Sequence, residues 1–334
     1  MARRKPKKPD RADSSWPHRV AWVLACGALL VICSGGLVTS YNAGMAVPNR
    51  AGPGAGSLFS FYPPGDWLAV WDVFLEHGHR LVGAVVAIVA VGLAVVLWLH
   101  DGRRWLRWLG AIAVGAVLVE GTLGGLRVLG DEILLAKVHA WIAPLLFALC
   151  GALVTVTSPR WLDRAGPKPH PAAQWVQNLA VAGAIGVYLQ VVLAAQLRHV
   201  SPQGTSDGWF QLWVWLHLIV AGLVAAVLVW LMTLMARRLS DRPMLVRWGW
   251  LLVGLFLLQL VLGVTTWVAS YGWPRWFVNY FLAIEYTVVA EGRLQTLATT
   301  AQVAIGALNL LAASSLVLWS LRLLDRSPST ASRR

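Results

Sequence analysis

The residues best suited to metal or acid–base chemistry in this sequence are histidines that lie beside long apolar runs. His77 and His79 occur in the string EHGHR, and His139 and His217 each lie near the start of a later apolar run. An ionisable or metal-binding group inside a membrane is energetically costly, so it indicates a functional site by default. Two neutral imidazoles on facing helices of a four-helix bundle are a common way to hold a haem iron. We therefore interpret His79, His139 and His217 as candidate iron ligands.

Charged residues accompany these histidines at helical spacing. His79 and Arg80 follow Glu76 by three and four residues, so the three side chains can share one face of a helix. The alternatives for Glu76 are an ion pair that anchors the helix end and a carboxylate that transfers protons or stabilises charge beside a bound cofactor. Arg80 and Arg127 are candidates for binding haem propionates. Glu120 lies about two turns before Arg127, and we expect it either to line a polar pocket or to hydrogen-bond to a neighbouring helix.

The elements that must position these residues are membrane helices. Of the 334 residues, 57% are hydrophobic and only 13% are charged, and the mean hydropathy is +0.62. Soluble globular proteins carry about 25% charged residues, so the composition excludes a soluble enzyme, a disordered tail protein and a disulfide scaffold. A membrane-spanning helix needs about 20 mostly apolar residues. Eight stretches qualify, namely residues 20–40, 80–99, 107–127, 137–157, 175–197, 214–236, 247–269 and 297–320.

The distribution of basic residues predicts how these helices are oriented. Twenty-one of the 28 Lys and Arg residues fall in the two tails and in the loops near residues 100–107, 158–174 and 236–248, which all lie on one side. The positive-inside rule assigns that side, and both termini, to the cytoplasm. The net charge of +13 is thereby explained by topology, and we expect no nucleic-acid partner. The predicted fold is an all-α, multi-pass protein of the inner cell membrane.

Part of the helical pattern is repeated. His217 follows His79 by 138 residues, and Gln259 follows Glu120 by 139. The repeat predicts eight transmembrane helices arranged as two tandem four-helix bundles in the same orientation. The expected organisation is a basic tail (1–19), a first bundle (20–157), a linker (158–174), a second bundle (175–320) and a C-terminal tail (321–334). In the last helix, the position equivalent to a histidine carries Gln302.

Three strings resemble a known family. They are GGLVTSYNAGMAVP at residues 35–48, EHGHRLVGA at residues 76–84, and a segment at residues 120–140 that begins EGTLGGLRV and ends LLAKVHA. These strings resemble haem A synthase, the CtaA/Cox15 family. The resemblance covers all eight expected helices, and it is stronger in the first half than in the second.

This resemblance implies a membrane enzyme that oxidises the C8 methyl group of haem O to the formyl group of haem A, the cofactor of the terminal oxidase. The oxidation proceeds by successive hydroxylations, with oxygen taken from water. The resemblance further implies that His79 and His139 hold the reacting haem, that Glu76 is the acidic residue beside it, and that His217 ligates a haem b cofactor. Haem O synthase and oxidase assembly factors are the partners that it suggests, and it leaves a homo-oligomer open.

The sequence also departs from the family. The family's fourth histidine corresponds to Gln302, and an amide is a poor ligand for haem iron. Haem b in the second bundle would then be five-coordinate, differently ligated, weakly held or absent. The first outer loop, residues 41–75, lacks the Cys pair of some members, and its segment NRAGPGAG (49–56) is unlike the usual family sequence.

Two other functions stay open on the sequence. One is a non-catalytic membrane protein that binds haem or carries electrons, which the loss of the fourth histidine fits. The other is a small-molecule transporter, which is disfavoured because inverted-repeat transporters have an odd number of helices in each repeat.

Overall fold

A computed structural model describes residues 15–46, 67–130, 132–163, 166–200, 208–281 and 286–326. Within these ranges, eight helices are long and apolar enough to cross a membrane. They are α1 (Trp16–Ser40), α2 (Trp71–His100), α3 (Arg104–Gly130), α4 (Ile133–Thr157), α6 (Ala173–Arg198), α7 (Trp209–Arg238), α8 (Pro243–Tyr271) and α10 (Arg293–Leu323). The short elements are α5 (Pro159–Leu162), α9 (Arg275–Tyr280), β1 (Lys168–Pro169) and β2 (Leu324–Asp325). The prediction of an all-α multi-pass membrane protein is confirmed.

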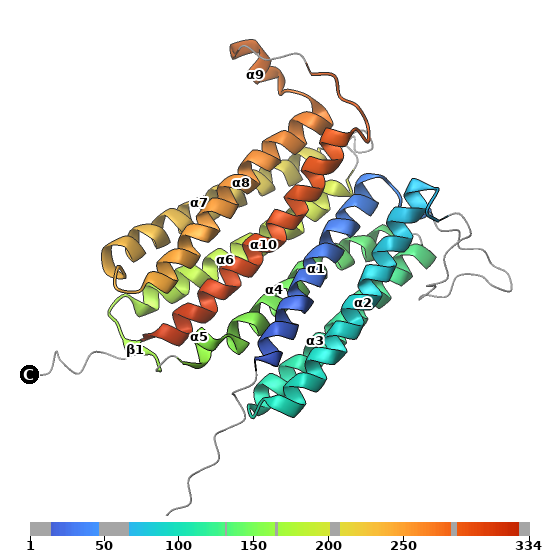
Figure 1. The fold of residues 1–334 in the computed structure, drawn as a ribbon. Helices are drawn as coiled ribbons and strands as arrows, with labels where there is room; N and C mark the ends of the chain where they lie inside the picture. The colour runs from blue at the N-terminus through green and yellow to red at the C-terminus, as the bar shows by residue number, and fades with distance from the viewer. Residues whose placement is uncertain are drawn as a thin grey trace, which may run out of the picture.

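The long helices form two rings of four that lie side by side (Figure 1). In the first ring α1 packs on α2, α2 on α3, α3 on α4 and α4 on α1; the second ring joins α6, α7, α8 and α10 in the same way. Helix α10 also packs on α1 and α4, and α4 packs on α6, so these four helices form the interface between the rings. The start of α1 and the end of α10 lie at the same end of the molecule (Figure 1). The division into separate domains and the cytoplasmic location of this end stay predictions.

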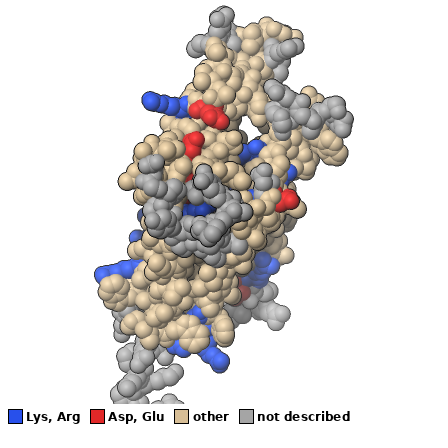
Figure 2. Space-filling view, turned by 90° about the vertical axis from the view of Figure 1, so that its right-hand side faces the viewer, with Lys and Arg blue, Asp and Glu red and all other residues tan. Residues whose placement is uncertain are grey.

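The outward faces of the helices are apolar, as contact with lipid requires. Ile88, Val229 and Ile185 expose 71%, 68% and 64% of their surface. Charged side chains form small separate groups on the face shown in Figure 2, and the surface between them carries no charge. Membrane helices associate closely where small residues meet a neighbour. Gly151 on α4 is such a place, since a Cβ atom there would lie 2.5 Å from the side chain of Leu311 on α10.

Two candidate histidines lie deeper in their helices than the sequence predicts. Helix α2 begins at Trp71 and α7 at Trp209, so both helices start before the apolar runs at residues 80–99 and 214–236 from which they are predicted. The segment before His79, WDVFLEHG, is rich in apolar and aromatic residues that continue the helix outward. Each histidine follows its helix start by eight residues, which corresponds to about 12 Å at 1.5 Å per residue. Both side chains therefore belong to the span itself.

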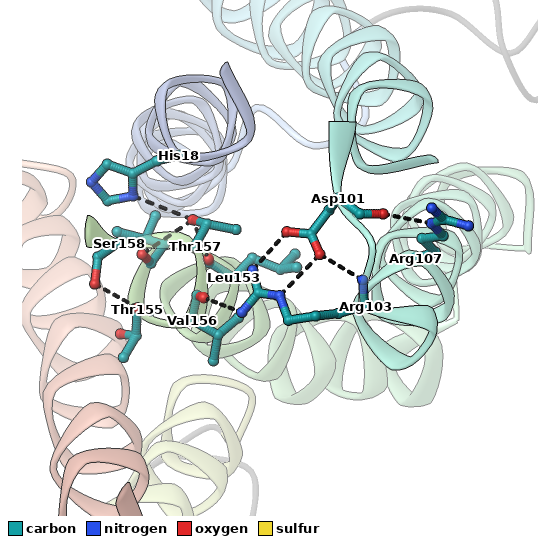
Figure 3. A network of polar contacts seen from close by, with 10 residues as sticks. His18, Asp101, Arg103, Arg107, Leu153, Thr155, Val156, Thr157 and Ser158 are labelled. Carbon is teal, nitrogen blue, oxygen red and sulfur yellow. Dashed lines mark hydrogen bonds and ion pairs between the residues drawn. The ribbon is translucent and has the colours of Figure 1, made fainter. Parts of the chain in front are cut away.

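A polar network joins α2, α3 and α4 at the end of the first ring where α1 begins (Figure 3). The Asp101 carboxylate accepts hydrogen bonds from the main-chain nitrogen of Arg103 at 2.9 Å and from its guanidinium at 2.7 and 2.9 Å. Arg103 also donates to the carbonyl of Val156, and Arg107 donates to the carbonyl of Asp101. Burial raises the pKa of Asp101, but the hydrogen bonds and charge of Arg103, helped by Arg107, outweigh it and hold this pKa below its ordinary value.

The connection between the rings is fastened to the end of α10. Strands β1 and β2 pair in parallel, with Lys168 opposite Leu324. The side-chain amide of Gln177 donates to the carbonyls of Ser320 and Leu324 at 3.3 and 3.0 Å. The start of α6 and the end of α10 are thereby held together at this side of the second ring.

We expect Asp101→Asn to lower the free energy of unfolding by about 1 to 3 kcal/mol, because it removes hydrogen bonds between charged groups. The measurement is thermal unfolding in detergent micelles. Since the pKa of Asp101 is lowered in the folded state, its contribution is present above the unfolded pKa of about 4 and is lost as the pH falls further. The difference from the parent should therefore hold at neutral pH and shrink below about pH 4.

The matched control is Asp163→Asn. Asp163 is exposed near the same end of the molecule, and its carboxylate has no partner among the described residues. Equal melting temperatures for the parent and Asp101→Asn at pH 7 would contradict a stabilising role for the network.

Candidate functional site

The side chain of His79 on α2 is held by α1. Nδ1 of His79 lies 2.9 Å from Oγ of Ser34, and the same hydroxyl donates to the carbonyl of Val31 at 3.0 Å. A serine hydroxyl has one hydrogen, so Ser34 accepts from Nδ1–H of His79 and leaves Nε2 of the ring unprotonated. A Cβ atom at Gly35 would lie only 3.0 Å from Cε1 of His79, and the missing side chain therefore makes room for the ring.

The side chain of His139 on α4 is held by α3 in a similar way. Its Nδ1 contacts the carboxylate of Glu120, which is an acceptor and therefore assigns the proton to Nδ1. Glu120 is buried, with 8% of its side chain exposed. Gly124, one turn further along α3, packs against the ring, since a Cβ there would lie 3.4 Å from Cε1 of His139. The expectation that Glu120 bonds a neighbouring helix thus fits this contact.

The imidazoles of His79 and His139 lie within electrostatic range of each other. Neither Nε2 atom has a hydrogen-bond partner in the part of the chain that the structure describes. Histidines that bind metals almost always donate their second ring N–H to an acceptor, which fixes the tautomer and the orientation of the ring. Both imidazoles have this arrangement, with Nδ1 occupied and Nε2 available.

A bare metal ion does not suit this region. Across the described ranges, no three His, Cys, Asp or Glu side chains gather in a way that could hold a metal ion. Two imidazoles suit a metal that brings its own equatorial ligands, as the iron of a haem does.

Charged side chains surround the two histidines. Arg80 donates to Oε1 of Glu76 at 2.5 Å, one turn along α2, and only 3% of the Glu76 side chain is exposed. Arg127 on α3 lies within electrostatic range of both members of this pair. Its guanidinium lies near Gly44, after the end of α1, and has no ion-pair partner among the described residues. Arg127 is therefore more available to an incoming anion than Arg80.

A further cation reaches the first ring from the second. Arg198, at the end of α6, donates to the carbonyl of Gly36 at 3.0 Å and to Oγ of Ser40 at 2.6 Å, both on α1. Burial, followed by the positive charges of Arg198, Lys137 and Arg127, lowers the pKa of His199 to about 4. His199 is thus neutral at physiological pH, and this junction between the rings is a cationic region that suits carboxylates.

Sequence reasoning did not identify Ser34 or Arg198. The signal for Ser34 was its place before two glycines in an apolar run, which is typical of close helix contacts. The signal for Arg198 was a charged residue at the end of a span on the side with few basic residues.

The other residues singled out in the sequence lie outside the site formed by His79 and His139. His77 is 1% exposed, and its ring packs edge to face on Trp67 with 5.1 Å between centroids, so its environment differs from that of His79. In the second ring, Nδ1 of His217 is buried and has no hydrogen-bond partner among the described residues. The Nε2 atom of Gln302 lies beside Gly263 on α8. Most of the loop that lacks the Cys pair, residues 47–66, is outside the described residues.

Comparison with known proteins gives a family match over the first part of the chain and two similar relatives. Residues 1–151 match the model of the COX15-CtaA family, described as cytochrome oxidase assembly protein. The chain is similar to a Heme A synthase of Shouchella clausii (strain KSM-K16), with 25% identity over 195 residues, which cover 57% of this chain and 62% of the relative. A Heme A synthase of Lysinibacillus sphaericus (strain C3-41) is 29% identical over 189 residues, covering 55% and 58%. The match spans less than two thirds of either relative.

We expect Arg198→Met to destabilise the protein by about 1 to 3 kcal/mol, because it removes charged hydrogen bonds that join the rings. Thermal unfolding in detergent checks this. The control is Arg247→Met, which removes an exposed arginine near the other end of the molecule. A drop in melting temperature as large for Arg247→Met as for Arg198→Met would show that the contact of Arg198 with α1 contributes nothing specific.

Proposed function

We propose that this chain, whose residues 1–151 match the model of the COX15-CtaA family, is a haem A synthase-like membrane oxidoreductase. In this proposal it oxidises the C8 methyl group of haem O to the formyl group of haem A and takes the oxygen from water. The single observation that carries the proposal is the pair of imidazoles on α2 and α4, each with an acceptor at Nδ1 and an available Nε2.

His79 and His139 would bind the iron of the substrate haem from its two sides. Ser34 and Glu120 would position the imidazoles, because Ser34 accepts the Nδ1 proton of His79 and the Glu120 carboxylate contacts Nδ1 of His139. Both Nε2 atoms would then be left for the metal. Glu120 contributes further, since a carboxylate partner increases the basicity of the imidazole. Gly35 and Gly124 allow the imidazoles of His79 and His139 to lie close to the neighbouring helices α1 and α3.

Each hydroxylation would replace a C–H bond of the methyl group by a C–O bond to the oxygen of water and release two protons and two electrons, the electrons passing to an external electron acceptor. Glu76 would accept one of these protons. It lies one turn from His79 on α2, and its ion pair with Arg80 supports a negatively charged carboxylate in an otherwise apolar span. Arg127, with Arg80 beside it, would bind the propionates, for which a planar guanidinium is well suited. The cationic junction around Arg198 would attract the same anionic groups.

The proposed setting is the inner cell membrane, where haem O is delivered and cytochrome oxidase is assembled. Haem O synthase and oxidase assembly factors are the proposed partners, since one must supply the substrate and the others receive the product.

The second candidate is a membrane protein that binds haem or carries electrons without oxidising it. The observation that favours it is Gln302, which stands in α10 where the repeat calls for a second histidine of the second ring. Haem A distinguishes the two functions, because the oxidoreductase forms it and the non-catalytic protein does not. A transporter, the third possibility, would bind no haem at all.

We expect cells that make haem O and this chain to accumulate haem A, and His79→Ala to abolish it by removing an iron ligand. Extraction of the haems and their separation by chromatography is the measurement. His100→Ala is the matched control, because it removes an exposed histidine from the other end of the same helix. Persistent haem O without haem A in cells that hold folded, haem-loaded protein would support the non-catalytic function instead.

We expect Glu76→Gln to keep haem bound but to slow oxidation by about 100-fold or more, the usual contribution of a general acid or base. Glutamine keeps the shape of the side chain and loses its charge. Haem content and haem A formation are measured on the same preparation, with Asp72→Asn, an exposed carboxylate earlier in α2, as the control. Full activity of Glu76→Gln would leave Glu76 an anchor for the helix.

A further inference from the structure

Two glutamine side chains of the second ring bind the main chain of a neighbouring helix at His217 and at Gln302. The amide of Gln190 on α6 donates to the carbonyl of His217 on α7 at 2.8 Å. The side-chain amide of Gln259 on α8 donates to the main-chain carbonyl of Gln302 on α10 at 3.1 Å. Gly306 on α10 brings α6 and α8 together, because a Cβ there would lie 3.6 Å from Nε2 of Gln259 and 3.8 Å from the side chain of Val191.

This group occupies the place that the histidine site occupies in the first ring. Gln259 follows Glu120 by 139 residues, and each side chain points to the last helix of its own ring. Gly124 packs against the ring of His139, and Gly263 packs against the amide of Gln302. The pair Glu120 and His139 therefore corresponds to the pair Gln259 and Gln302.

The two differences between these pairs depend on each other chemically. Without an imidazole at 302, a carboxylate at 259 would be a buried charge with no partner, which is strongly destabilising. Without a carboxylate at 259, an imidazole at 302 would lack the acceptor that orients a metal-binding histidine. Replacing both by glutamine removes both costs and leaves a neutral core.

The residues of the second ring do not fit a haem held by two imidazoles. Among the four residues joined by the Gln190 and Gln259 hydrogen bonds, His217 carries the one imidazole, and its Nδ1 has no hydrogen-bond partner in the described part of the chain. Oε1 of Gln190 and Oε1 of Gln259 are likewise buried without a partner there. Two acceptor oxygens and one ring nitrogen suit small neutral hydrogen-bond donors such as water, and an amide is a poor ligand for haem iron.

We propose that the second ring is a neutral amide site that holds no six-coordinate haem, and that Gln259 and Gln302 together determine this. The inference rests on the proposed function for the first ring, because it assigns the chain one haem, bound between His79 and His139. Glu120 and Gln259 act as positioning residues, each through the residue that it faces on the last helix of its ring.

The first test counts the haems bound to the full-length protein by the pyridine haemochrome method after purification in the presence of haem. We expect one haem per chain, its loss in His139→Ala and its retention in His217→Ala, with size-exclusion profiles confirming that both variants are folded. Two haems per chain, or loss of haem in folded His217→Ala, would overturn the inference. One haem that is independent of His217 in a protein that forms no haem A would contradict the proposed activity alone. A folded protein without haem would contradict the haem site proposed between His79 and His139, on which the inference rests.

The second test rebuilds the missing pair. We expect Gln259→Glu with Gln302→His to raise the content toward two haems and to add a low-spin, six-coordinate spectrum. Gln302→His alone should strengthen haem binding in the second ring but hold this haem about 10- to 100-fold more weakly than the double variant, the usual effect of a missing partner of a ligand.

The matched control is Gln259→Glu with Gln295→His, which adds the same residue types but places the histidine about two turns away on α10. It should bind no second haem. If the rebuilt variant is folded but keeps one haem and an unchanged spectrum, α10 does not present residue 302 to a ligand, and the inference fails. A control as effective as the rebuilt pair would overturn it equally.

Discussion

A polar side chain inside the apolar part of a membrane must find its hydrogen-bond partner on its own or a neighbouring helix, since lipid offers none. In the first ring this requirement joins α2 to α1 through His79 and Ser34, and α4 to α3 through His139 and Glu120. The partners that satisfy the histidines are thus also the contacts that hold adjacent helices together. The chemistry of the site and the packing of the ring depend on the same few hydrogen bonds.

The two helix rings provide partners for their buried polar side chains in different ways. The first keeps the carboxylates of Glu76 and Glu120 beside the imidazoles of His79 and His139, and positive charges from Arg127 and Arg198 lie close by. The second keeps an equivalent arrangement of helices but fills its core with amides. A shared architecture therefore carries one charged site and one neutral site. Arg198 connects the two helix rings, because it lies at the end of α6 in the second ring and its guanidinium donates hydrogen bonds to α1 in the first.

Much of this arrangement could be predicted from the sequence, and the limits have physical causes. Long apolar runs predict all eight spans, because spanning length and apolarity are local properties. The start of α2 was misplaced because aromatic residues and charged ones alternate at Trp71–Arg80, where the membrane boundary has no sharp signal. His79, His139 and Glu120 were identified because ionisable residues are rare in apolar runs. Ser34 was not, since a serine in a membrane helix becomes significant only when the helix that faces it is known.

The glycines beside the two histidines have a consequence for how tightly a ligand is bound. A Cβ atom at Gly35 or Gly124 would lie 3.0 or 3.4 Å from Cε1 of the adjacent imidazole, and each Nδ1 contacts a polar partner, so both imidazoles are restricted in how they can turn. The loss of rotational freedom has therefore occurred during folding, before any ligand arrives. Association then avoids this entropic cost.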